Sequence, residues 1–237
     1  MSTLQTLTGL IDGLDLPSLE NTYFSKYEYN GRKIPRVTTI LSAMMHADTL
    51  MYWANNLGFK GIRYKEFMTE GANIGTEAHF RIEMFLKEKL ESEDNVPYLG
   101  FKQWWNDIIS GGNTIEVVGS EIELKCPYFG GTADALVKIN GGYYLIDFKT
   151  SNHVTYKYFL QLAAYQYMLS LQDIYLSGVI VLQLDKEDVG YNEYSLHYSD
   201  PSHKDFMDKC TNTFFSLVYA FYNVREGEAL FNNIYGE

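Results

Sequence analysis

The sequence has few cysteines, a deficit of positive charge and no long apolar run. Its two cysteines, Cys126 and Cys210, exclude a disulfide framework and any four-cysteine metal or iron–sulfur site within one chain. The apolar run FFSLVYAFY near the C-terminus is much too short to span a bilayer. The N-terminus lacks the basic region that begins a secretory signal. We therefore expect an intracellular, soluble protein with no membrane partner and no iron–sulfur cluster.

Basic residues are outnumbered, with 19 Lys and Arg against 30 Asp and Glu, for a formal net charge of −11. This balance argues against a protein that coats nucleic acid non-specifically, because such a protein needs a basic excess. A local basic groove remains compatible with it. Two short clusters supply cations, Arg32, Lys33 and Arg36 in one and Lys60, Arg63 and Lys65 in the other. Either cluster by itself is typical of a solvated surface.

Repeats, low-complexity tracts and Pro/Gly-rich linkers are also missing, so we expect a single domain. Its parts are an N-terminal extension with a hairpin (1–37), a helical region (38–113) and a sheet core with a C-terminal helix (114–237). The dipeptide Asn30-Gly31 predicts the turn of the hairpin. Thr38 or Thr39 is expected to cap a helix that ends near Gly58.

Helix and strand patterns follow one another along the rest of the chain. A helix is expected to begin at Thr76, with Ile82, Phe85, Leu86 and Leu90 as its apolar stripe. Further helices are expected over 98–110, 154–171 and 203–223, and strands over 114–124, 132–139, 143–149, 176–184 and 191–198. This order predicts an α/β fold in which helices pack on a mixed sheet.

The stretch GGTADALVKINGGYYLIDFKTS, residues 130–151, places charged residues in two otherwise apolar strands. A two-residue turn at Gly141-Gly142 would set Lys149 opposite Asp134. The two-residue period of a strand then puts Asp134, Asp147 and Lys149 on one face of the sheet. Diagonal carboxylates on paired strands have Cα atoms roughly 7–8 Å apart and can converge on one hard cation.

Simpler interpretations exist for each of these residues. A solvated strand explains an isolated Asp-x-Lys triplet more often than a site does. An ion pair between Asp134 and Lys149 would satisfy both charges without any chemistry. The combination with the following helix favours a site, because Lys157, Gln161 and Tyr165 recur there at i, i+4 and i+8 on one stripe.

Four short motifs follow one another in the chain: Gly75-Thr76-x-x-His79, Gly131-Thr132-Ala133-Asp134, Ile146-Asp147-Phe148-Lys149-Thr150 and Gln161-x-x-x-Tyr165. In this order they resemble the PD-(D/E)xK nuclease superfamily, most closely its RecB-like exonuclease branch. The stretch IPRVTTIL, with Trp53 after it, further resembles phage exonucleases related to the mitochondrial genome maintenance exonuclease. The resemblance covers about residues 34–184, and Ala133 replaces the nominal proline of the family.

The resemblance implies a restriction-endonuclease-like mixed sheet and a deoxyribonuclease that depends on one or two Mg²⁺ or Mn²⁺ ions. Glu121 and Glu123 share a face of the preceding strand and either could reach a second ion, and the spacing in the family favours Glu121. The implied metal ligands are His79, Glu121, Asp134, Asp147 and the backbone carbonyl of Phe148. The implied catalytic residues are Asp134, Asp147 and Lys149, and the implied substrate-binding residues are Gln161 and Tyr165.

The expected activity is an exonuclease that degrades single-stranded DNA from its ends, in DNA repair or recombination. If phage-encoded, such an enzyme would work in the cytoplasm of a host cell. The alternatives are a related endonuclease, a catalytically silent nuclease fold that binds or assembles, and a plain β-meander with surface ion pairs. Aromatic residues beside the basic residues 60–65 suit a single strand, namely Tyr52, Trp53, Trp104 and Trp105. These same tryptophans could equally fill the core.

Overall fold

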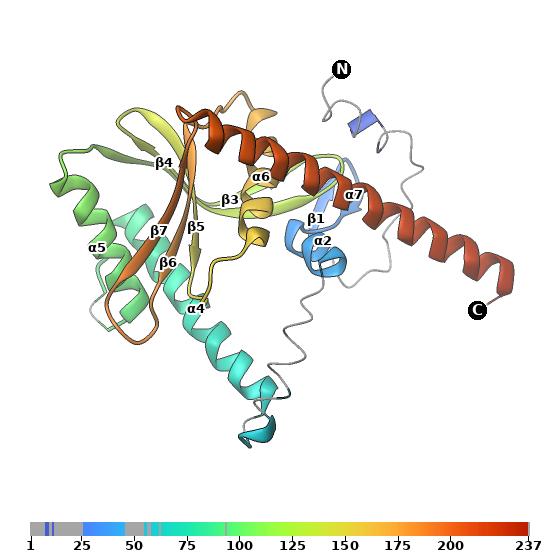
Figure 1. Cartoon of the computed structure of the whole chain (residues 1–237), viewed down its shortest axis with the longest axis horizontal. Coiled ribbons are helices and arrows are strands. Elements are labelled where there is room, and N and C mark those ends of the chain that lie inside the picture. The colour runs from blue at the N-terminus through green and yellow to red at the C-terminus, as the bar shows by residue number, and fades with distance from the viewer. Residues whose placement is uncertain are drawn as a thin grey trace.

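The computed structural model describes residues 8–9, 11, 26–45, 55, 58–61, 63–92 and 94–236, with the side chains of 64–68 and 70 excepted. The chain alternates between helices and strands in these residues (Figure 1). In chain order, the elements are β1 (Tyr27–Tyr29), β2 (Arg32–Ile34), α2 (Val37–Met44), α4 (Tyr64–Glu88), α5 (Val96–Ser110), β3 (Ile115–Lys125), β4 (Gly130–Ile139), β5 (Gly142–Lys149), α6 (Tyr156–Ser170), β6 (Gly178–Leu184), β7 (Tyr191–His197) and α7 (Pro201–Tyr235).

The main sheet has five strands in the order β3-β4-β5-β6-β7, while β1 and β2 form a separate hairpin. Neighbouring strands are antiparallel except β5 and β6, which run parallel. Two parallel strands need a crossover connection, and α6 provides it. The predicted fold class, a mixed α/β sheet flanked by helices, is confirmed.

Helices cover both faces of the sheet (Figure 1). Leu136 and Leu145 point to the face that packs on α2, α6 and α7. Ala135 and Ile146 point to the opposite face, which packs on α4 and α5. This alternation along β4 and β5 is the two-residue period of a strand, and it gives each face of the sheet its own apolar core.

The hairpin turn at Asn30-Gly31 is confirmed, with φ of 48° and 78°. The predicted turn between β4 and β5 is wrong by one residue. The turn lies at Asn140-Gly141, with φ of 51° and 81°, so Ile139 pairs with Gly142. Asn-Gly is a preferred pair where both central residues of a two-residue turn have positive φ angles. Gly142, the second residue of the predicted turn, already belongs to β5.

The corrected register changes which charged residues face each other. The pairing of Ala135 with Ile146 places Asp134 beside Asp147 at the next position, whereas the predicted turn set Asp134 against Lys149. The slip involves an even number of residues, so the face of each side chain is unchanged. The prediction that these three charged residues share one face therefore stands.

Two predicted helix caps are wrong. Arg36 occupies the cap position of α2 without a side-chain hydrogen bond, and α2 ends at Met44 rather than near Gly58. Thr76 does not begin a helix, because α4 starts at Tyr64 and runs through it. Gly75 serves a packing role there: a Cβ atom on it would lie 3.1 Å from Thr150 Oγ1, at the end of β5.

Two further boundaries differ from prediction. Leu90 was expected on the stripe of α4 but follows its left-handed C-cap, Lys89, and is exposed. Helix α7 extends to Tyr235 rather than residue 223, because no residue breaks it before Gly236 adopts a positive φ. Figure 1 shows this last part of α7 projecting beyond the sheet.

The interpretation of Trp104 and Trp105 as stacking platforms is wrong. Both are buried on α5, in the core against β5 and β6, and Trp104 donates its indole N–H to Glu193. Tyr52 and Trp53 lie outside the described residues, as does the side chain of Lys65. Lys60 and Arg63, which precede α4 in the chain, are exposed.

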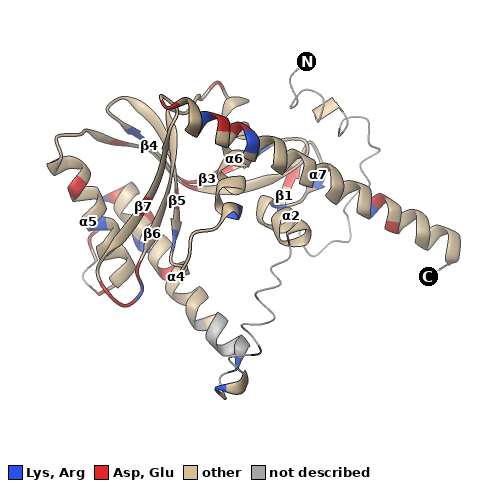
Figure 2. Cartoon of the chain, viewed as in Figure 1, with Lys and Arg blue, Asp and Glu red and all other residues tan. Residues whose placement is uncertain are grey.

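Charge is distributed without a dominant basic element in the described part of the chain. Figure 2 shows Lys and Arg interspersed with Asp and Glu along α7. Across the described residues, none of the helices combines the length and apolarity that a bilayer crossing needs.

Candidate active site

Three elements bring His79, Glu121 and Asp134 together. His79 lies on α4, Glu121 on β3 and Asp134 on β4, and one nitrogen or oxygen atom from each lies within 4.8 Å of the others. His79 Nδ1 is 3.6 Å from Asp134 Oδ1 and 4.0 Å from Glu121 Oε1. His79, Glu121 and Asp134 thus form one cluster, although the first and the last of them are 55 positions apart in the sequence.

Glu121 reaches this cluster through an unusual backbone conformation. Its φ is 51°, in the left-handed region that residues other than glycine rarely adopt. Ser120 pairs with Ala135 and Ile122 with Ala133, so Glu121 lies beside Asp134. The other candidate on this strand, Glu123, forms an ion pair with Lys125 instead. The structure therefore places Glu121, and not Glu123, beside His79.

His79 is oriented by the end of β5. Its Nε2 lies 3.1 Å from the backbone carbonyl oxygen of Phe148, which can accept a hydrogen bond from it. A neutral imidazole that donates from Nε2 leaves the lone pair of Nδ1 facing Asp134 and Glu121. Histidines that bind metals are usually held in this way by their second nitrogen. Burial alone would lower the pKa of His79, but Asp134 and Glu121 outweigh it and raise the pKa.

Asp147 is buried beside this cluster, with 1% of its surface exposed. Its Oδ1 accepts hydrogen bonds from Lys149 Nζ at 2.7 Å and from Gln161 Nε2 at 3.2 Å. Its Oδ2 is buried and has no hydrogen-bond partner among the described residues. Burial raises the pKa of Asp147 to about 6, against the opposing effect of Lys149. An unsatisfied buried carboxylate oxygen is costly, and a bound cation would satisfy it.

The donor set fits a hard divalent cation. It consists of one imidazole nitrogen and carboxylate oxygens, which suit Mg²⁺ and, with the imidazole, Mn²⁺. Neighbouring ligands of an octahedral Mg²⁺ lie about 3.0 Å apart and opposite ligands about 4.2 Å apart. His79 Nδ1 lies 3.6 Å from Asp134 Oδ1 and 4.0 Å from Glu121 Oε1, so it would approach the two carboxylates by about 0.6–1.0 Å to share one ion with them. Asp147 lies outside the group of His79, Glu121 and Asp134, and its Oδ2, which has no partner among the described residues, is the oxygen that it could offer to such an ion from the neighbouring strand.

Lys149 is held between a carboxylate and an aromatic ring. Its ammonium donates to Asp147 and lies 5.0 Å from the ring centroid of Tyr158. Burial alone would lower the pKa of Lys149, but Asp147 and Asp134 outweigh it and raise the pKa, so the side chain is a cation at neutral pH. A fixed cation in this position can stabilise negative charge that develops on a reacting phosphate.

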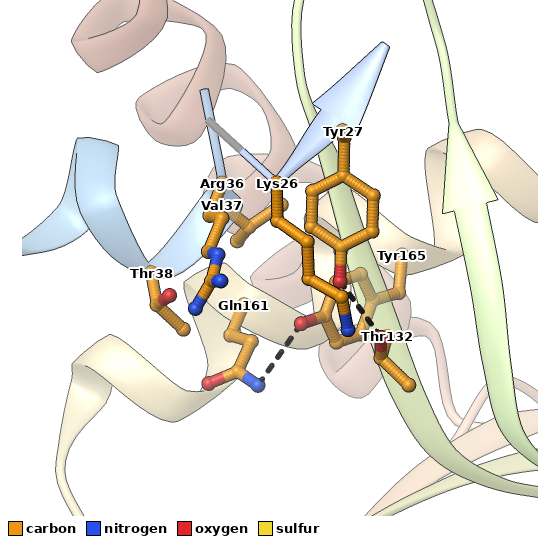
Figure 3. Close-up of a pocket in the computed structure, with 9 residues that line it drawn as sticks. Lys26, Tyr27, Arg36, Val37, Thr38, Thr132, Gln161 and Tyr165 are labelled. Atoms are coloured by element: carbon orange, nitrogen blue, oxygen red, sulfur yellow. Dashed lines mark hydrogen bonds between the residues drawn. The ribbon is translucent and has the colours of Figure 1, made fainter. Parts of the chain in front are cut away.

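Gln161 and Tyr165 lie one helical turn apart and face a cavity of about 240 Å³ (Figure 3). Gln161 Nε2 is 3.3 Å from the hydroxyl of Tyr165, and both side chains are largely buried. Lys157, expected on the same stripe, contacts Ser42 on α2 at 3.3 Å. The cavity is lined by Lys26, Tyr27, Arg36, Val37, Thr38, Gly131, Thr132, Gln161 and Tyr165.

The cations of this cavity come from the N-terminal hairpin region. Figure 3 shows the Arg36 guanidinium beside Gln161, and the Lys26 ammonium near Thr132. A parallel bridge between Arg36 and Gly130 fixes this segment along the start of β4. The sequence had shown Arg36 only as part of a basic cluster, and it gave no signal for Lys26, because their proximity to α6 depends on long-range packing.

Comparisons with known proteins show similarity of structure only. The sequence matches no protein-family profile and no curated protein. The crystal structure of SSO0001 is similar at 15% identity and a TM-score of 0.37, covering 91% of this chain and 84% of that one. An alkaline exonuclease (LHK-Exo) from Laribacter hongkongensis is similar at 14% identity and a TM-score of 0.38, covering 83% and 93%. Its complex with dAMP gives 14% identity and a TM-score of 0.34, covering 82% and 92%. At these scores the neighbours carry no argument about activity, which must come from the site itself.

Proposed function

We propose that this protein is a metal-dependent deoxyribonuclease that hydrolyses phosphodiester bonds. The observation that carries the proposal is the convergence of His79, Glu121 and Asp134 beside the Asp147–Lys149 pair. Most buried carboxylate oxygens in folded proteins have a hydrogen-bond partner, whereas Asp147 Oδ2 has none among the described residues.

Different residues of the proposed site have different roles in hydrolysis. A divalent ion held by His79, Glu121, Asp134 and Asp147 would supply positive charge at the scissile phosphate and lower the pKa of an attacking water. Lys149 orients that water and stabilises the negative charge of the transition state. The Phe148 carbonyl, which the resemblance suggests as a further ligand, orients His79 in the geometry described above.

We further propose that the substrate is single-stranded DNA entered from an end. The cavity with Lys26 and Arg36 adjoins Gln161 and gives phosphates a local basic site in an otherwise acidic protein. Local cations of this kind track the backbone of a single strand without reading its sequence. Trp104 and Trp105 do not contribute to this site, since both are buried on α5.

A gel assay with Mg²⁺ or Mn²⁺ on end-labelled DNA tests both levels of the proposal. Linear single strands should be degraded from an end, duplexes more slowly, and covalently closed single-stranded circles should survive. Rapid cutting of the circles would make the protein an endonuclease and leave the metal chemistry intact. Absence of cleavage with either ion, in protein whose melting temperature rises on addition of Mn²⁺, would reduce the site to a metal-binding one.

A further inference from the structure

A second cavity lies on the α4 side of the metal-ligand cluster. It is lined by Thr76, His79, Phe80, Glu83, Glu121, Thr132 and Asp134 and has a volume of about 550 Å³. Small-molecule sites typically have volumes of roughly 300–1,000 Å³. Thr132 also lines the cavity that contains Lys26 and Arg36, so the two cavities meet at this residue of β4.

Phe80 gives this cavity an exposed aromatic surface. It follows His79 on α4, and Thr76, Phe80 and Glu83 recur at i, i+4 and i+7, on one face of the helix. The side chain is 53% exposed, although Ile82, Phe85 and Leu86 on the same helix are buried. It makes no ring contact with another aromatic residue in the described part of the chain.

The charges of the two cavities differ. The cavity beside Phe80 has no Lys or Arg in its lining, and its carboxylates are Glu83, Glu121 and Asp134. Carboxylates repel phosphates, so the cavity disfavours the DNA backbone away from a bound metal. The cavity with Lys26 and Arg36 attracts it. A nucleotide that spans Thr132 would therefore have its phosphate toward the cations and its uncharged base toward Phe80.

We propose that Phe80 is a stacking platform for an unpaired nucleobase of the nucleotide next to the scissile phosphate. This inference rests on the proposed function and assigns to it a specificity-determining residue. Bases inside a duplex have both faces covered by their neighbours, so only an unpaired or terminal base stacks on the ring. Phe80 thereby favours single strands and is tolerant of sequence, because every base has a π face.

The test compares Phe80→Ala with Phe80→Trp and with Phe231→Ala as a matched control. Phe231 is also a helical phenylalanine, is 54% exposed and lies on the projecting part of α7. Loss of one base–aromatic stack lowers the affinity for the strand by roughly 5- to 150-fold. Phe80→Ala should therefore raise KM for a single-stranded oligonucleotide by at least about 5-fold, while Phe80→Trp and Phe231→Ala change it by less than about 2-fold.

A substrate with one abasic nucleotide at the cleavage position separates stacking from a structural effect. Wild type should bind this substrate more weakly than the normal one. Phe80→Ala should bind the abasic substrate as well as wild type does, because the base that would stack is already missing. Equal penalties for Phe80→Ala on the normal and abasic substrates would overturn the proposal. Fluorescence anisotropy with the same oligonucleotides in the Asp134→Asn background gives a readout without cleavage. If wild type fails to cleave, the proposed function fails, and the binding comparison still decides the role of Phe80.

Discussion

Asp134 Oδ2 accepts a hydrogen bond from the backbone N–H of Phe148, with 2.8 Å between the two atoms. The carbonyl of Phe148 lies 3.1 Å from His79 Nε2 on the other side of the residue. One peptide segment at the end of β5 therefore orients both a carboxylate and an imidazole. Because Oδ2 is occupied, Oδ1 is the oxygen of Asp134 that faces His79.

We predict that Asp134→Asn abolishes cleavage and leaves the protein folded. The amide oxygen can still accept from the N–H of Phe148, which places the NH₂ group toward His79 and Glu121, where it cannot bind a metal. Asp147→Asn should also be inactive, because it removes charge from a buried carboxylate. The measurement is a gel assay together with thermal melting: the rise in melting temperature with Mn²⁺ should be lost in both variants.

Glu123→Gln is the matched control for these variants. It lies on the strand that carries Glu121 but pairs with Lys125, away from His79. We expect wild-type cleavage and a wild-type response to Mn²⁺. Normal activity in either aspartate variant would remove that aspartate from the proposed site.

Lys149→Ala should lower turnover by orders of magnitude and largely preserve metal binding. The ammonium contacts Asp147 Oδ1, whereas Oδ2 is the oxygen without a partner, so the lysine serves the transition state rather than the cation. Titration calorimetry with Mn²⁺ in parallel with single-turnover kinetics measures both. A variant that loses metal binding as well as turnover would assign Lys149 a structural role.

The raised pKa of Asp147 predicts how stability and metal affinity depend on pH. Between its ordinary value of 3.8 and about 6, the folded apo protein keeps a proton that the unfolded chain has released. Stability of the apo protein therefore falls as pH rises through this window. Metal binding needs the ionised carboxylate, so the affinity for the metal increases as pH rises. The increase is about tenfold between pH 5 and pH 7 for the release of one proton.

Mn²⁺ titrations at several pH values check this expectation. The raised pKa of His79 adds to the same trend, since its protonated form cannot be a ligand. Asp147→Asn should reduce the change in melting temperature of the apo protein between pH 4 and pH 6, because the titrating carboxylate is removed. An apo protein that becomes steadily more stable over that range would contradict the assignment.

The faces of β4 and β5 could be predicted from the sequence because side chains alternate with a fixed period of two. The register could not, because two adjacent turns, Asn140-Gly141 and Gly141-Gly142, both satisfy the local pattern. The positive φ angles of Asn140 and Gly141 decide between them, and these emerge only with the completed strand pairing.

Long-range features were less predictable still. Arg36 reaches the cavity beside Gln161 through a backbone bridge to Gly130, a contact that spans 94 positions in the chain. Glu121 points to His79 because its φ is positive, which no residue pattern indicates for a glutamate within a strand. Phe80 shows only as an apolar residue beside His79, and its exposure depends on how α4 packs on the sheet.

Gly131→Ala should destabilise the protein and displace Tyr165, which contacts Gln161. A Cβ atom at this position would lie 2.5 Å from Tyr165 Cε1, so the ring must move and with it the contact to Gln161. Overpacking of this kind costs typically about 1–3 kcal/mol. Gly190→Ala is the control, because a Cβ atom there meets nothing within 4 Å. Denaturant unfolding measures the difference, and equal stability of the two variants would contradict the predicted clash.

Arg36→Gln should weaken the binding of single-stranded DNA by removing one cation from the cavity beside Gln161. Each phosphate that a protein neutralises on a single strand contributes about −0.7 to the slope of log K against log salt concentration. We expect the slope to become shallower by about 0.7 in Arg36→Gln and to stay unchanged in Lys33→Gln. Lys33 belongs to the same basic cluster, is exposed on β2 and does not line the cavity. Anisotropy titrations at several salt concentrations give both slopes. If the two variants shift the slope equally, Arg36 acts only through the overall charge of the protein, and the phosphate must bind elsewhere.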